Sequence, residues 1–364
     1  MNVGKPFEDF VTTIERNAAH REDVVARLNT CRMASDASGS VWTINGVGEY
    51  ESTPVFHRSV AETLKIPTSY YADMQATYPA LLDANINSWL KAEQDRETRL
   101  MRLFDASLTG TGRGVARAIR STSFLPLDND ELLTQLRPVL DESGVTVQSC
   151  DIGERRTYIK ITTPRLKGDV RVGDTVEAGI VVSNSEVGYG NISVAPFVLR
   201  LVCTNGLTTL NGSDEAIRRI HRGSTIHCFQ PFIHLSDNNE RKAAKAAIWA
   251  AVSEAVGVAL QQTSFRELLE RLQAAHKAKL SAKTNSEKLF DRIGKDFGLT
   301  DAERTAAIHH FETDNERSLW GMANAITRIA NDAGDYERSS ALEQIGGRII
   351  QLPEKEWRQL TELN

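Results

Sequence analysis

Hydrophobic residues recur with helical spacing in two stretches of the first quarter of the chain. The first thirty residues place their apolar side chains on one side of a helix, and the spacing returns from Pro54 to Lys91. Between these stretches, residues 39–51 form two short alternating runs joined by Asn45-Gly46, the preferred dipeptide of a two-residue hairpin turn. Residues 1–98 are therefore predicted to form a mixed helical segment with one short hairpin.

Residues 59–71 have the spacing of two helices joined by a tight turn. A DNA-reading helix-turn-helix would place basic or polar groups on its second helix. Here that helix carries Tyr70, Tyr71 and Met74 instead, so we do not expect this pair to read DNA.

The pattern changes to period two in the middle of the chain, residues 99–212. Four alternating runs, separated by glycine-containing turns, cover residues 145–150, 157–162, 175–183 and 191–203. Before them, Asp128 begins a helix with an acidic first turn. Consecutive strands with short links form antiparallel meanders. The sequence thus predicts an α+β fold, with a central antiparallel meander sheet and a helix packed on one face.

The last region, residues 213–364, is predicted to be helical. Residues 239–280 contain no proline and a single glycine, which predicts one continuous helix of about 60 Å at 1.5 Å per residue. A helix of that length usually crosses several elements or reaches a neighbouring subunit, so a homo-oligomer is expected. Further helices are expected near residues 285–297, 301–312 and 316–331.

Composition places the chain among globular proteins. Of its 364 residues, 41% are hydrophobic and 25% are charged, a usual balance for a soluble chain. No apolar run reaches the roughly 18 residues that cross a bilayer, and the first thirty residues lack the apolar core of a signal peptide. The four cysteines are scattered, without a C-x-x-C pair. These features predict a cytoplasmic protein with no membrane partner.

Charge suggests where a polyanion could bind. The net charge is −5, but the middle of the chain is basic and both ends are acidic, so nucleic-acid binding would need a local groove. The guanidinium group of arginine can donate two hydrogen bonds to the oxygens of one phosphate, and such contacts need no fixed sequence motif. The rings of Tyr158 or Tyr189 could stack on bases. The candidate nucleic-acid-binding residues are Arg113, Arg117 and Arg120 in a glycine-rich loop, then Arg155, Arg156, Lys160, Arg165, Lys167 and Arg171, and finally Arg218, Arg219 and Arg222.

Motifs of catalysis and cofactor binding are absent. There is no G-x-S-x-G, and the glycines at 110, 112 and 114 match neither a Walker loop nor a dinucleotide fingerprint. The zinc candidates have a spacing unlike that of paired zinc ligands; they are His221, His227, Cys228 and His234. We therefore predict no metal and no cofactor. The alternative that the protein is an enzyme with an unrecognised site stays open.

The stretch Ile180–Leu207 resembles the signature of a family known only as a domain of unknown function, the nine-hundred-and-thirty-second of its catalogue. Its specific elements are Ser183-Asn-Ser-Glu-Val-Gly188 and Cys203-Thr-Asn-Gly206, with Pro126-Leu-Asp-Asn129 as a weaker one. The resemblance extends over roughly residues 35–350. It implies a phage- or plasmid-borne setting, and the order of strands and helices is similar to that of single-strand annealing proteins.

These observations together predict a non-catalytic nucleic-acid-binding protein of phage or plasmid origin. Single-stranded DNA, bound or annealed in recombination, is the favoured partner. The alternative is a protein-interaction factor that modulates host machinery. The polar residues 183–190 are expected to form a structural turn between strands, because Asn, Ser and Gly are what tight turns require.

Overall fold

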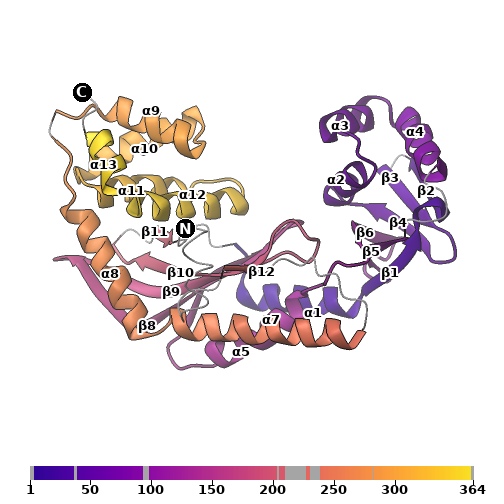
Figure 1. The fold of residues 1–364 in the computed structure, drawn as a ribbon, viewed down its shortest axis with the longest axis horizontal. Helices are drawn as coiled ribbons and strands as arrows, with labels where there is room; N and C mark the ends of the chain where they lie inside the picture. The colour runs from indigo at the N-terminus through magenta and orange to yellow at the C-terminus, as the bar shows by residue number, and fades with distance from the viewer. Residues whose placement is uncertain are drawn as a thin grey trace.

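The computed structural model describes residues 4–36, 39–92, 98–202, 205–209, 227–229, 238–281 and 283–361. Within these residues the strands form two six-stranded sheets, here called sheet A and sheet B. Helices cover both, and the two sheets with their helices lie at opposite ends of the molecule's long axis (Figure 1). The fold is α+β, as the hydrophobic pattern predicts.

Sheet A is the predicted antiparallel meander. Its strands pair in the order β11-β10-β9-β8-β7, with β12 also pairing with β10. They are β7 (Thr146–Ile152), β8 (Thr157–Arg171), β9 (Asp174–Asn184), β10 (Ile192–Arg200), β11 (Asn205–Thr208) and β12 (His227–Phe229). The prediction of the four alternating runs is thus confirmed, and β8 continues nine residues beyond the predicted run.

Helices cover both faces of sheet A (Figure 1). Helices α1 (Phe7–Ala19), α5 (Asn129–Leu140) and α7 (Asn238–Ala259) lie on one face, and α11 (Leu319–Ile329) and α12 (Tyr336–Ile350) lie on the other. Ile161, Ile180 and Val182 point to the first face and pack with Leu136 and Trp249. The predicted helix after Asp128 is confirmed as α5.

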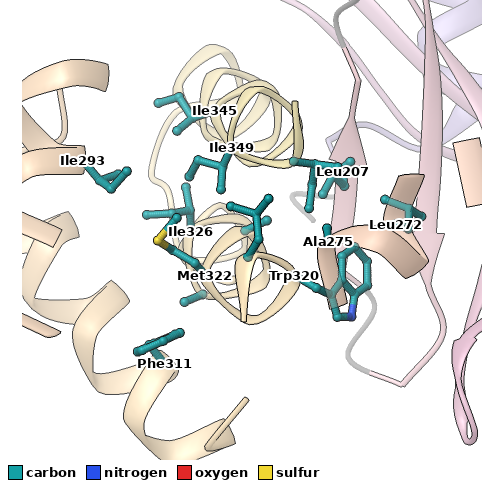
Figure 2. Packing of buried hydrophobic residues seen from close by; sticks show 14 of the residues in the cluster. Leu207, Leu272, Ala275, Ile293, Phe311, Trp320, Met322, Ile326, Ile345 and Ile349 are labelled. Atoms are coloured by element: carbon teal, nitrogen blue, oxygen red, sulfur yellow. The ribbon is translucent and has the colours of Figure 1, made fainter. Parts of the chain in front are cut away.

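The C-terminal helices form a core of their own around α11. The remaining members are α8 (Gln262–Lys277), α9 (Ser286–Phe297), α10 (Asp301–Asp314) and α13 (Glu354–Thr361). Trp320, Met322 and Ile326 of α11 are at most 1% exposed. Met322 and Ile326 lie on the side of Phe311 of α10 and Ile345 of α12, whereas Trp320 lies beside Leu272 and Ala275 of α8 (Figure 2). A capping box between Thr300 and Glu303 begins α10, which explains why its start is readable in the sequence.

The expectation of one continuous helix over residues 239–280 is wrong. The chain forms α7 and α8, which meet at an angle of 59°. The bend lets α7 pack on β9 and β10 while α8 packs on β8, where Leu269 lies against Gly168. Among the described residues, no single helix is long and apolar enough to cross a membrane; α7 and α8 reach that length and composition only as a bent pair.

The sequence pattern predicted one hairpin in the first part of the chain but no second sheet. The hairpin is present and belongs to sheet B. Its strand order is β1-β5-β6-β4-β3-β2, with β4 and β6 parallel and the other pairs antiparallel. The strands are β1 (Arg21–Arg27), β2 (Cys31–Asp36), β3 (Gly39–Ile44), β4 (Gly48–Ser52), β5 (Thr98–Phe104) and β6 (Gly114–Ser121). The β3–β4 loop has three residues, 45–47, instead of the predicted two-residue turn, and Gly46 adopts a φ of +79° within it. Strands from both sides of residue 98, the predicted boundary, therefore belong to one sheet.

Three helices cover sheet B: α2 (Pro54–Thr63), α3 (Thr68–Thr77) and α4 (Pro79–Ala92). Trp42, Phe56, Ile86 and Met101 fill the core between them and the sheet. The N-terminal helix is shorter than expected, because α1 ends at Ala19 and the chain then pairs with β5.

Replacing Ile326 with Ala is expected to lower the free energy of unfolding by about 2–5 kcal/mol, because this fully buried side chain leaves a cavity. Leu81→Ala is the control, since Leu81 is 58% exposed and should change stability by about 0.5 kcal/mol or less. Urea unfolding measures both. Equal midpoints for the two variants would contradict the packing of α11.

Candidate functional site

Two of the family-like elements of the sequence, residues 126–129 and 183–188, meet where the two sheets join. Residues 185–191 link β9 to β10, and Glu186 in this link is buried. Its carboxylate accepts a hydrogen bond from the backbone N–H of Asn129 at 2.8 Å and one from the guanidinium of Arg117 on β6. One side chain therefore binds the first turn of α5 and a strand of sheet B. We call this region the junction.

Asn184, the last residue of β9, makes further hydrogen bonds that hold the same link in place. Its side-chain amide donates to the carbonyl of Leu127 at 2.8 Å and to Oδ1 of Asn129 at 2.9 Å. Asn129 in turn donates to the hydroxyl of Thr157 at 2.9 Å. The elements 126–129 and 183–188 thus bind each other, which accounts for the polar residues as structural groups.

Two glycines of the link allow arginines to pack on it. Gly188 and Gly190 have φ values of +74° and +146°. A Cβ atom at Gly188 would lie 2.7 Å from Nε of Arg120, and one at Gly190 would lie 2.5 Å from Nη1 of Arg156. Both the backbone conformation and the close approach therefore require glycine here.

A buried charge network lies beneath the link. Arg102 of β5 has no exposed side-chain surface, and its guanidinium contacts Asp128 at 2.6 Å and Asp23 at 3.1 Å. Burial alone would raise the pKa of Asp128, but Arg102 and Arg21 more than offset it and hold that pKa below its ordinary value. Burial raises the pKa of Asp23 against the opposing charge of Arg102.

The first predicted basic run is not a flexible loop over its whole length. Residues 114–121 form β6, so Arg117 and Arg120 project from a strand. Arg113 pairs with Asp36 at 2.9 Å. Arg117 binds Glu186 with its guanidinium carbon 4.1 Å from the ring centre of Phe104, and Arg120 donates to the Val187 carbonyl at 2.5 Å. Two of these three arginines therefore belong to the junction.

The structure divides the second basic run between the two ends of β8. Arg155 and Arg156 lie at the junction, whereas the other end holds Arg165, Lys167 and Arg171. Nine residues of strand separate Arg156 from Arg165, a distance of about 30 Å. Those three side chains pair with Glu142, Glu177 and Glu316 respectively. The two basic runs therefore do not line one groove together.

Lys160 is not a surface residue, contrary to the prediction. Its side chain is fully buried and its ammonium group lies 2.7 Å from a carboxylate oxygen of Glu343, which is also fully buried. A strand phosphate cannot reach it. Tyr158 is buried against Tyr336, and Arg218, Arg219 and Arg222 lie outside the described residues.

A cavity of about 140 Å³ opens at the junction, here called the junction cavity. Arg117, Arg155 and Arg156 line it together with Glu154 and Glu186. Arg156 donates to the hydroxyl of Ser183 at 2.8 Å. Nη1 of Arg117 and Nε of Arg156 are buried without a hydrogen-bond partner in the described part of the chain. Buried donors of this kind favour an anionic ligand or water.

The other side of the 153–156 turn has the opposite charge. A second cavity, of about 210 Å³, is lined by Asp151, Glu154, Asp335 and Glu337 as well as by the two arginines of the turn. Carboxylates repel phosphate, so an anion is expected only on the Arg117 side of this turn.

Tyr189 is the one stacking candidate of the sequence that reaches the junction surface. Its ring lies 4.4 Å from the guanidinium carbon of Arg120 and 5.6 Å from that of Arg58, and its hydroxyl donates to Glu62 at 3.0 Å. Among the residues that the structure describes, no group of three or more His, Cys, Asp or Glu side chains could hold a metal ion. His221 and His234, two of the zinc candidates, lie outside those residues, while His227 and Cys228 belong to β12.

Asn184→Ala is expected to lower the free energy of unfolding by about 1–3 kcal/mol, because the Leu127 carbonyl and Asn129 Oδ1 lose their shared donor in a buried place. Asn85→Ala on α4 is the control, because Asn85 is half-buried and its side chain makes no hydrogen bond within the described residues. Urea unfolding measures the difference. A parent-like midpoint for Asn184→Ala would contradict the structural role of the link.

Asp128→Asn is expected to lower the free energy of unfolding by about 3 kcal/mol at neutral pH, because the buried Arg102 is left with a single carboxylate partner. The folded protein holds the pKa of Asp128 below 3.8, so this stabilisation is present above that pH and is lost as the pH falls below it. Chemical unfolding between pH 2 and 7 measures the free energy of unfolding of the variant and of the parent. The difference between the two should disappear towards pH 2.

Asp130→Asn is the control for that series. Asp130 is more exposed than Asp128 and pairs with Arg21 at 2.9 Å. Its replacement should lower the free energy of unfolding by about 1 kcal/mol or less. A difference in free energy of unfolding between Asp128→Asn and the parent that stays constant with pH would contradict the charge network.

Comparison with known proteins identifies the family. The chain matches the family described as domain of unknown function (DUF932) over residues 116–344. The elements at 126–129 and 183–188 fall within this match, whereas residues 35–115, which the resemblance was expected to include, lie outside it. Neither a curated protein sequence nor a solved structure matches the chain. Because the match spans more than half of the chain, the protein belongs to this family of unknown function.

Proposed function

We propose that this protein binds single-stranded nucleic acid without catalysis, in a phage or plasmid setting, and that a backbone phosphate occupies the junction cavity. The observation that carries the proposal is that three arginines from two separate stretches of the chain share one cavity, although the two basic runs as a whole do not. Arg117 of the first run and Arg155 and Arg156 of the second line one cavity. Single-strand binding by backbone charge needs such a local site in a chain whose net charge is −5.

The chemistry of the lining suits a phosphate group. Three arginines face two glutamates there, which leaves a net positive charge. Arg117 and Arg156 both line the cavity, and guanidinium forks match phosphate oxygens. Arg155 is exposed at the same turn and has no ion pair in the described part of the chain, so its charge is available to a ligand.

The acidic cavity on the other side of the turn limits the contact. A strand that approaches Arg155 from that side would meet Asp151, Asp335 and Glu337. Few phosphates can therefore be neutralised at once, and we expect a shallow dependence of affinity on salt.

Arg155→Ala is expected to weaken binding of a single-stranded oligonucleotide and to reduce the slope of log affinity against log salt by about 0.7, the value of one phosphate contact. Fluorescence anisotropy at several salt concentrations measures both quantities. Arg155 is exposed, so the variant should melt like the parent.

Arg165→Ala is the matched control. Arg165 belongs to the same predicted run and its side chain is 58% exposed, but it lies at the far end of β8. It should keep the affinity and the slope of the parent. Equal losses for the two variants would assign binding to bulk charge, and an unchanged slope for Arg155→Ala would remove the junction cavity as the site.

A protein-interaction factor is the second candidate, and a row of exposed apolar residues favours it. Leu81 and Trp89 of α4 are 58% and 48% exposed, Tyr78 just before this helix is 61% exposed, and Tyr70 on α3 is 48% exposed. Exposed large side chains on one face are typical of protein contacts. This function predicts no salt-dependent binding of nucleic acid, so the same titration separates the two.

A further inference from the structure

A larger cavity lies on the other side of the α2 N-terminus, between sheet B and helices α2 and α3. Its volume is about 480 Å³, within the range of small-molecule sites. Ser52 and Pro54 line it, and Thr53 between them lines the junction cavity, so the two cavities lie next to each other along the chain. We call it the α2–α3 cavity.

A buried pair of polar side chains forms one wall of this cavity. His57 of α2 is 6% exposed and Tyr71 of α3 is 2% exposed, and Nδ1 of the imidazole lies 2.9 Å from the tyrosine hydroxyl. The hydroxyl is also 3.4 Å from the sulfur of Met33. Burial lowers the pKa of His57 to about 4, so the imidazole is neutral at physiological pH. His57 has no other side-chain hydrogen bond in the described part of the chain, which leaves Nε2 without a protein partner.

The rest of the lining combines donors and acceptors with little charge. Ser40, Ser52, Thr68 and Gln75 contribute hydroxyl and amide groups, and Glu51 contributes a carboxylate. A glutamine amide presents a donor beside an acceptor, the arrangement that pairs with the edge of a nucleobase. A hydrocarbon ligand would leave these groups unpaired, and a polyanion would meet only one cation here.

That cation is Arg58, whose position links the cavity to the junction. Arg58 lines the α2–α3 cavity, is exposed, and forms an ion pair with Glu62 at 3.2 Å. Its guanidinium carbon lies 5.6 Å from the ring centre of Tyr189, a residue of the β9–β10 link. A ligand with a neutral heterocycle and an attached phosphate would place the heterocycle inside and the phosphate near Arg58.

We propose that the α2–α3 cavity binds a single unstacked nucleobase, so that its ligand is a nucleotide unit. The inference rests on the proposed function for the source of that nucleotide, which is a strand whose backbone is held at the junction. Proteins that recognise single strands commonly hold splayed bases by hydrogen bonds to their edges. The cavity adds this kind of contact to the phosphate contact at Arg155.

The test uses the full chain and titrates it by calorimetry with each of the four deoxynucleoside 5′-monophosphates and with 2-deoxyribose 5-phosphate, which lacks the base. At least one nucleotide is expected to bind with one-to-one stoichiometry, about tenfold or more tighter than the sugar phosphate, because the base edge contributes directed hydrogen bonds. Equal affinities would show that only a phosphate binds, and no saturable binding would likewise overturn the proposal.

A pair of matched variants locates the site. Ala72 and Ala76 are both exposed on α3, but only Ala72 lines the cavity. Ala72→Trp should block the cavity and abolish nucleotide binding, whereas Ala76→Trp should bind like the parent, and both should melt like it. If Ala72→Trp fails to fold, Gln75→Ala replaces it and should weaken nucleotide binding about fivefold or more. Parent-like nucleotide binding by the variant used would overturn the proposal.

The titration of the oligonucleotide keeps the two proposals distinguishable. A parent that binds the oligonucleotide through Arg155 but no mononucleotide would overturn the cavity site and leave the proposed function in place. Mononucleotide binding that Ala72→Trp abolishes, without any oligonucleotide binding, would support the cavity site and overturn single-strand binding as the function.

Discussion

The contact of Glu186 with the first turn of α5 is the interaction on which the arrangement of the two sheets depends. Its carboxylate is buried, accepts a backbone N–H at a helix N-terminus and binds Arg117 from the other sheet. An environment of low dielectric strengthens both contacts. Loss of this carboxylate would leave Arg117 unpaired at the boundary between the sheets.

Burial of charge at the junction also limits what this surface can bind. Arg102 and Asp128 are enclosed and form an ion pair with each other, so they stabilise the boundary and are not available to a ligand. Arg117 and Arg156 are held by protein partners and each retains one unpaired donor. Of the three arginines that line the cavity, Arg155 is the one that is exposed. The same residues therefore hold the fold together and line the junction cavity.

The candidate site was readable from the sequence in part. The polar residues 183–188 and the basic runs were recognisable, because glycine, asparagine and arginine have local preferences and charges that do not depend on the fold. Their grouping in space was not recognisable, because Arg155 lies in the turn before β8 whereas Arg165 lies well along that strand. His57 and Tyr71 were also missed as a pair, since burial and a cavity arise only when α2 and α3 pack on sheet B.

The sequence by itself determined the elements whose signals are local. The strands β7 to β10 alternate with period two, α5 begins after Asp128, and α10 starts at a capping box. Tertiary structure alone decided that Arg21 to Arg27 pair with β5, that residues 239–280 bend into two helices, and that Lys160 is buried with Glu343. In each case the deciding partner lies far along the chain or across the sheet. The free energy of that pairing and burial is absent from any local window of residues.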